Sequence, residues 1–104
     1  MPSKRLEVLH SMVEQKPDDA FTRYALAMEY VNTGGLEGAV VQFTELLKHN
    51  PTYAAGYFQG GQALAKLGRV EEARDLYSRG IDVTTASGDE HTRSELIGAL
   101  QMLG

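Results

Sequence analysis

The sequence predicts an all-α fold: an α-solenoid of antiparallel helix pairs, with about six helices. A pattern of proline, glycine, alanine and aromatic residues recurs 34 positions along the chain. Within each copy, apolar residues recur at the spacing of one helix face. The length of 104 residues, with 42% hydrophobic and 23% charged residues, suits one globular domain.

The period is clearest in the residues that break helices. Pro17 and Pro51 are 34 positions apart, as are Gly34 and Gly68. The same offset pairs residues of similar size or polarity: Ala20 with Ala54, Tyr24 with Phe58, Leu36 with Val70, Glu37 with Glu71, Ala39 with Ala73, Phe43 with Tyr77, and Leu47 with Ile81. We therefore expect two equivalent structural units.

Each unit is typical of a helical hairpin. The pattern predicts helices over residues 20–32 and 36–48 in the first unit and about 52–67 and 70–83 in the second. Gly34 and Gly68 end the first helix of each unit, because glycine adopts the left-handed conformation at low cost. The apolar spacing predicts further helices over residues 4–15 and 89–103. The predicted organisation is a single domain, 1–104, with an N-terminal helix 4–16, repeats 20–53 and 54–87, and a C-terminal capping helix 89–103.

These units resemble the tetratricopeptide repeat (TPR) family, whose pattern is W-x₂-L-G-x₂-Y, then A-x₃-F, then P. At these positions the first unit has Arg23, Leu26, Ala27, Tyr30, Ala39, Phe43 and Pro51. The second has Tyr57, Gly60, Gly61, Leu64, Ala73 and Tyr77, with Thr85 at the proline position. The spacing matches the family pattern closely, whereas the individual residues match it loosely. The resemblance covers residues 20–87 directly and the flanking helices by analogy.

Small residues in this pattern predict where paired helices meet. Ala27 and Gly61 stand where two antiparallel helices approach closely, so a larger side chain would push them apart. Gly60 replaces a large apolar residue, which weakens its helix by roughly 1 kcal/mol and leaves volume to fill. Thr85, in place of proline, predicts a longer and looser connection through Ser87 and Gly88.

The helix over residues 20–32 carries more apolar surface than one packed face needs. Beside its fold-making residues it holds a second stripe of Phe21, Tyr24, Met28 and Val31, and we expect only Thr22, Ala25, Glu29 and Thr33 on the remaining side. The equivalent stripe of the second unit holds Ala55, Phe58, Gln62 and Ala65, with Lys66 at its edge.

The resemblance implies that these stripes line a concave groove in which peptides or helices of a partner protein bind. The expected partner-binding residues are Phe21, Tyr24, Met28, Val31, Phe58, Gln62 and Lys66. An alternative is that the stripes are core, packed under the first or last helix. Chaperone-binding members of the family clamp a terminal carboxylate with lysine and asparagine, and Tyr24, Met28 and Phe58 instead favour an apolar or amphipathic ligand.

Several other functions are disfavoured. The chain has no cysteine and a formal net charge of −4, which argues against thiolate metal sites and against a nucleic-acid partner. No segment is apolar enough to span a membrane, so we expect a cytoplasmic protein. The pairs His10–Glu14 and His91–Glu95 are expected to be solvated neighbours. We expect no enzyme activity, no catalytic residue, no metal site and no cofactor.

The alternative function is structural. The helix over residues 4–15 corresponds to the second helix of a unit whose first helix is missing. It could stack on another subunit, which would give a homodimer through the solenoid ends.

Overall fold

A computed structural model describes residues 3–103, and within that range it contains six α-helices and no strand. The helices are α1 (Lys4–Gln15), α2 (Ala20–Asn32), α3 (Leu36–His49), α4 (Ala54–Lys66), α5 (Val70–Ser87) and α6 (Glu90–Met102). The predicted all-α repeat fold is confirmed. Met1, Pro2 and Gly104, which the predicted domain includes, lie outside the described residues.

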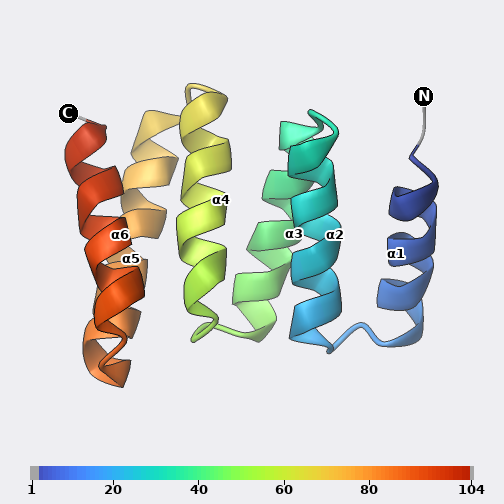
Figure 1. Cartoon of the computed structure of the whole chain (residues 1–104), viewed down its shortest axis with the longest axis horizontal. Coiled ribbons are helices and arrows are strands. Elements are labelled where there is room, and N and C mark those ends of the chain that lie inside the picture. Colours follow the sequence, from blue (N-terminus) through green and yellow to red (C-terminus); the bar gives the residue numbers. More distant parts are fainter. Residues whose placement is uncertain (1–2, 104) are drawn as a thin grey trace.

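The helices stand side by side, and each runs antiparallel to the next (Figure 1). In Figure 1, α2, α4 and α6 lie nearer the viewer than α3 and α5. Each helix packs on its neighbours in sequence, and α6 packs on α4 as well as on α5. The first repeat is therefore the pair α2 and α3, and the second is α4 and α5.

The two repeats end their first helices in the same way. Gly34 and Gly68 have φ of 81° and 79°, in the left-handed region that favours glycine. The backbone amide of the following residue then donates a hydrogen bond to a carbonyl in the last turn of the helix. Gly35 donates to the Tyr30 carbonyl at 2.8 Å, and Arg69 donates to the Leu64 carbonyl at 2.9 Å. This 34-residue period thus corresponds to a repeated backbone geometry.

Side chains repeat the same contact even where their identities differ. Arg23 donates from Nη2 to the carbonyl of Pro17 at 3.3 Å. The residue 34 positions later, Tyr57, donates from Oη to the carbonyl of Pro51 at 2.6 Å. Both hydrogen bonds connect the first helix of a repeat to the turn that precedes it.

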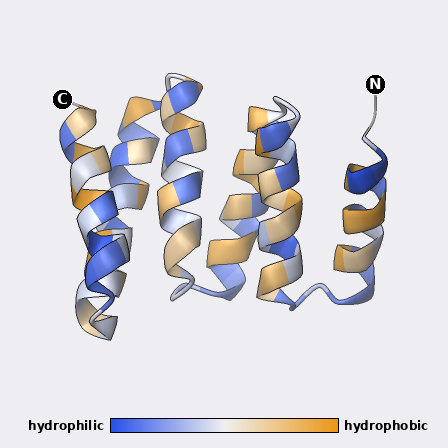
Figure 2. Cartoon of the chain, in the orientation of Figure 1, coloured by the Kyte–Doolittle hydropathy of each residue, from blue (hydrophilic) through white to orange (hydrophobic). Residues whose placement is uncertain are grey.

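Small residues allow the paired helices to approach, as expected. Ala27 and Ala39 are completely buried. A Cβ added at Gly61 would overlap the ring of Tyr77 on α5. The volume expected beside Gly60 is partly filled, because a Cβ there would lie 2.9 Å from Leu76 Cδ2 and 3.2 Å from Phe43 Cβ. Figure 2 shows hydrophobic and hydrophilic positions alternating around the same helices, as one-sided packing requires.

The expectation of a longer, looser connection after α5 is wrong. Thr85 lies inside α5, which continues to Ser87 and ends at Gly88 with φ of 78°. Threonine keeps the backbone N–H that proline lacks, so the helix propagates until a glycine ends it. Only Gly88 and Asp89 then separate α5 from α6.

We predict that Gly61→Ala destabilises the protein by about 1–3 kcal/mol, because its methyl group would force the Tyr77 ring and α5 outward. The matched control is Gly98→Ala in α6, where an added Cβ meets nothing within 4 Å. That change should stabilise by about 0.5–1 kcal/mol through helix propensity. Urea unfolding followed by circular dichroism measures both, and equal effects would contradict the close approach of α4 and α5.

Candidate functional site

Helix α1 covers one side of α2. Thr22 and Glu29, which were expected on the side of this helix that its apolar stripes leave over, are only 7% and 8% exposed. The reason is tertiary packing: α1 docks on this side, and local polarity does not determine burial there.

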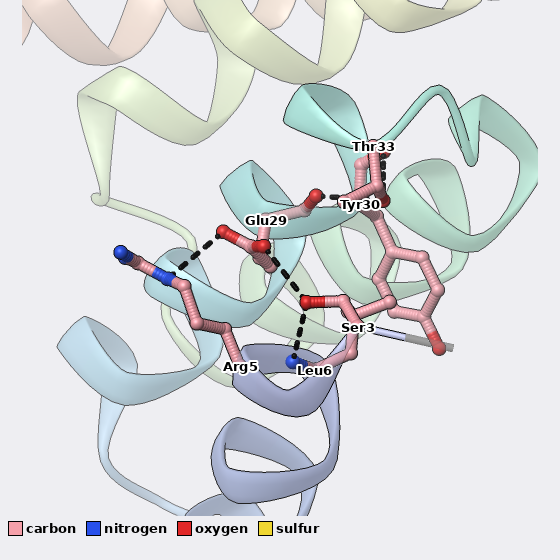
Figure 3. Close-up of polar contacts among 6 residues, drawn as sticks. All are labelled: Ser3, Arg5, Leu6, Glu29, Tyr30 and Thr33. Carbon is pink, nitrogen blue, oxygen red and sulfur yellow. Dashed lines mark hydrogen bonds and ion pairs between the residues drawn. The ribbon is translucent and has the colours of Figure 1, made fainter. Parts of the chain in front are cut away.

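The docking of α1 depends on polar contacts. The Ser3 hydroxyl donates to Glu29 Oε2 at 3.2 Å, and Arg5 Nε lies 3.3 Å from Glu29 Oε1 (Figure 3). His10 Nε2 and Tyr30 Oη are hydrogen-bonded at 2.6 Å. His10 therefore binds α2, and the expectation that it is a solvated neighbour of Glu14 is wrong. Val13 is the one buried residue of α1.

The predicted partner-binding residues lie on other sides of α2 and α4. Phe21 is 71% exposed, and Tyr24, Met28 and Val31 are half-buried. On α4, Phe58 and Gln62 are half-buried and Lys66 is exposed. We call the set Phe21, Tyr24, Met28, Val31, Phe58, Gln62 and Lys66 the α2–α4 surface. Its two helices lie in the same layer (Figure 1).

Aromatic rings join the two repeats at this surface. The ring centroid of Tyr24 lies 5.3 Å from that of Tyr53 and 6.1 Å from that of Phe43. Tyr53 stands at the N-cap of α4, a position that usually favours a short polar side chain, and it makes no capping hydrogen bond. Tyr53 is not among the residues predicted from the sequence, although an aromatic residue at a helix N-cap is a usable signal for tertiary packing.

Burial changes the chemistry of the paired tyrosines. It raises the pKa of the Tyr24 hydroxyl and that of the Tyr53 hydroxyl, because a phenolate is poorly solvated between packed rings. Both hydroxyls are therefore neutral at ordinary pH, and the two rings present an uncharged aromatic platform.

A further hollow extends this side of the molecule to α6. A cavity of 310 Å³ is lined by Gln62, Ala65, Lys66, Tyr77, Ala99, Met102 and Leu103. Met102 is 87% exposed. Met102 falls outside the predicted set, because α6 begins at Glu90, two residues later than a 34-residue offset from the start of α4 would place it.

A larger groove lies on the other layer, between α3 and α5. It has a volume of 660 Å³, and Gly60 is one of the residues that line it. The equivalent position in the first repeat holds the larger Leu26. The charges along its α5 edge pair with one another: Arg69 Nη2 lies 2.6 Å from Glu72, and Arg79 Nη1 lies 3.5 Å from Asp75. This groove therefore offers few uncommitted charges.

Other chemistry finds little support in residues 3–103. No group of three or more His, Cys, Asp or Glu residues there could hold a metal ion. His91 and Glu95 are exposed and 3.7 Å apart, as expected for solvated neighbours. No helix in this range is long and apolar enough to cross a membrane.

Comparison with known proteins defines the family. The chain is 35% identical to a tetratricopeptide repeat domain protein of Salinibacter ruber solved by NMR, with a TM-score of 0.79 over 85% of this chain and 89% of that one. It is 26% identical to TPR repeat-containing protein PA0015 of Pseudomonas aeruginosa, over 94% of this chain and 93% of that protein. No protein-family model matches the chain. This chain belongs to the tetratricopeptide repeat family.

More distant structures share the fold alone. The first TPR of Spaghetti (RPAP3), solved with the HSP90 peptide SRMEEVD, is 18% identical with a TM-score of 0.81 over 94% of this chain and 73% of that one.

We predict that the protein loses stability as the pH rises above about 10, the pKa of an unfolded tyrosine. Burial raises the pKa values of Tyr24, Tyr53 and Tyr77 in the folded state. Above pH 10 the unfolded chain therefore releases protons that the folded chain retains, which favours unfolding until the folded-state pKa is passed. Below pH 10 this contribution is constant.

The measurement is the free energy of unfolding between about pH 8 and 11, with tyrosinate absorbance followed in parallel. Tyr24→Phe should flatten the alkaline decline, because the substituted ring has no proton to lose. A decline of unchanged steepness in Tyr24→Phe would contradict the assignment of this residue.

Proposed function

We propose that this protein is a non-enzymatic protein-interaction module, which binds a peptide or helix of a partner protein through the α2–α4 surface. The observation that carries the proposal is the 71% exposure of Phe21 beside half-buried Tyr24 and Met28. Helix α1 packs on a different side of α2 and leaves these residues uncovered.

The residue types support a protein partner. Aromatic and methionine side chains provide large contact areas, and methionine adapts to varied shapes. The half-buried members of the surface pack against the core, which limits their freedom before a ligand arrives. A preorganised surface loses less conformational entropy on binding.

The distant relatives support the same class of ligand but not the same sequence. The RPAP3 domain binds SRMEEVD, which has two glutamates and a terminal aspartate. In this chain Lys66 is the one cation of the α2–α4 surface, and Tyr24, Met28 and Phe58 are uncharged. We therefore propose an apolar or amphipathic ligand in place of an acidic one.

The test starts by selecting ligands from a displayed library of random peptides with the wild-type chain. The double variant Phe21→Ala and Met28→Ala should bind a selected peptide at least about tenfold more weakly, because hot-spot side chains are lost. The matched control is Val41→Ala, which removes a 57% exposed apolar side chain from α3. The control should bind like the wild type.

The peptide SRMEEVD serves as the acidic comparison and should bind more weakly than the selected peptide. Equal affinities of the double variant and the control for the selected peptide would contradict the site. Failure of the wild type to select any peptide would contradict the function.

A second candidate, self-association, is favoured by α1. Its outer side exposes Val8 by 53% and Met12 by 45%, and a hollow of 430 Å³ there is lined by Lys4, Arg5, Val8 and Leu9. Apolar exposure of this kind is typical of protein interfaces.

If a homodimer forms through α1, its sedimentation coefficient should rise with concentration in the micromolar range. Met12→Lys should keep the chain monomeric, since it would bury a charge at the interface. A wild-type chain that remains monomeric throughout that range would remove this candidate.

A further inference from the structure

One end of the α2–α4 surface combines aromatic rings with a carboxylate. Helices α2 and α4 both begin at this end, so Asp19 and Tyr53, their N-cap residues, occupy equivalent positions in adjacent repeats. Phe21 lies two residues after Asp19, and Tyr24 lies one turn further along α2. The Tyr24 and Tyr53 rings are inclined at 40° with centroids 5.3 Å apart.

The Asp19 carboxylate is fixed in place and ionised. The Thr22 hydroxyl donates to Asp19 Oδ2 at 2.6 Å. That hydrogen bond is the main reason why the pKa of Asp19 lies below its usual value. The carboxylate also acts on the neighbouring platform: after burial, its negative charge is the second cause that raises the pKa of Tyr53. Negative charge therefore lies close to the aromatic rings at neutral pH.

The opposite end of the surface has the opposite charge. Lys66 is the last residue of α4, whereas Tyr53 immediately precedes the first. Lys66 lines the 310 Å³ cavity together with Gln62 and the exposed Met102. A ligand that lies along α4 thus meets a carboxylate at one end and an ammonium group at the other.

Helix capping does not account for the position of the Asp19 carboxylate. Asp89 caps α6 by accepting from the Thr92 amide at 3.1 Å, whereas Asp19 makes no side-chain capping hydrogen bond to α2. Capping does not explain why Phe21 is exposed beside Asp19, or why tyrosine takes the cap position of α4. Both features suit a ligand that contacts rings and a carboxylate together.

A guanidinium or ammonium group satisfies both requirements. Cations are attracted to the faces of aromatic rings, and arginine also stacks on rings while it hydrogen-bonds a carboxylate. The chain itself contains such a contact, since Arg79 Cζ lies 5.6 Å from the centre of the Tyr57 ring.

We propose that the partner segment bound by the α2–α4 surface carries an arginine or lysine, and that this side chain lies on Phe21, Tyr24 and Tyr53 beside Asp19. This inference rests on the proposed function, and it adds the charge and the direction of the ligand. The cationic residue binds where α2 and α4 begin, away from Lys66.

The experiment uses the full chain and a displayed library of random peptides. Peptides selected by the wild type should be enriched in arginine or lysine relative to the library. One selected peptide is then synthesised in two forms, as selected and with its cationic residue replaced by uncharged norleucine.

Asp19→Asn is the informative variant, because asparagine caps a helix about as well as aspartate. It should bind the cationic peptide about fivefold more weakly and leave the affinity of the norleucine peptide unchanged. The matched control is Asp89→Asn, which makes the same change at the N-cap of α6, a helix with no Phe, Tyr or Trp. The control should bind both peptides like the wild type.

The outcomes separate the two proposals. Selected peptides with no cationic enrichment, or equal losses in Asp19→Asn and Asp89→Asn, would overturn this inference and leave the proposed function standing. If the wild type selects no peptide, the proposed function fails and this inference fails with it.

Discussion

The packing of tyrosine rings against glycine backbone determines how closely the paired helices lie. A Cβ at Gly38 would fall 2.5 Å from Tyr30 Cε1, and one at Gly61 would overlap Tyr77. At Gly80 the obstructing atom would be Tyr57 Cβ, at 2.6 Å. The first contact joins α2 to α3, and the others join α4 to α5. Each tyrosine side chain occupies the space that a side chain on the glycine would need, so the rest of the repeat geometry depends on the absence of that side chain.

Because the helix pairs are fixed, each neighbouring helix covers a different side of α2. Helix α3 covers the side of Ala27, and α1 covers the side of Thr22 and Glu29. The side with Phe21 and Met28 has neither neighbour. Tyr24 lies at the margin of this side, where it joins the first repeat to the second through Tyr53. The candidate site is therefore the side of α2 that neither α1 nor α3 covers, although its half-buried residues Tyr24, Met28 and Val31 also pack against the core.

The period and the helix breaks were predictable because they depend on local chemistry. Glycine ends α2 and α4 through its left-handed backbone, and that preference can be read from a single residue type. The burial of Glu29 was not predictable, since it depends on where α1 docks. The absence of a proline at position 85 does not by itself predict a looser connection, because threonine lets α5 continue to Ser87.

In the candidate site, too, some residues follow from local sequence pattern and others depend on tertiary packing. The apolar stripes of α2 and α4 follow from helical spacing, and the exposure of Phe21 agrees with an open surface. Tyr53 lies outside both helices, so periodicity could not select it. Its role appears only when two repeats are placed side by side. The 34-residue period could not predict the residues that α6 adds to this surface, because α6 begins 36 residues after α4.

The order of helix contacts also has a kinetic consequence. Every helix packs on helices one or two places away in the chain, and the two ends of the molecule do not meet. Proteins with such local contacts close only short loops as they fold, and they fold rapidly for their size. Nucleation in either hairpin can therefore spread outward one helix at a time.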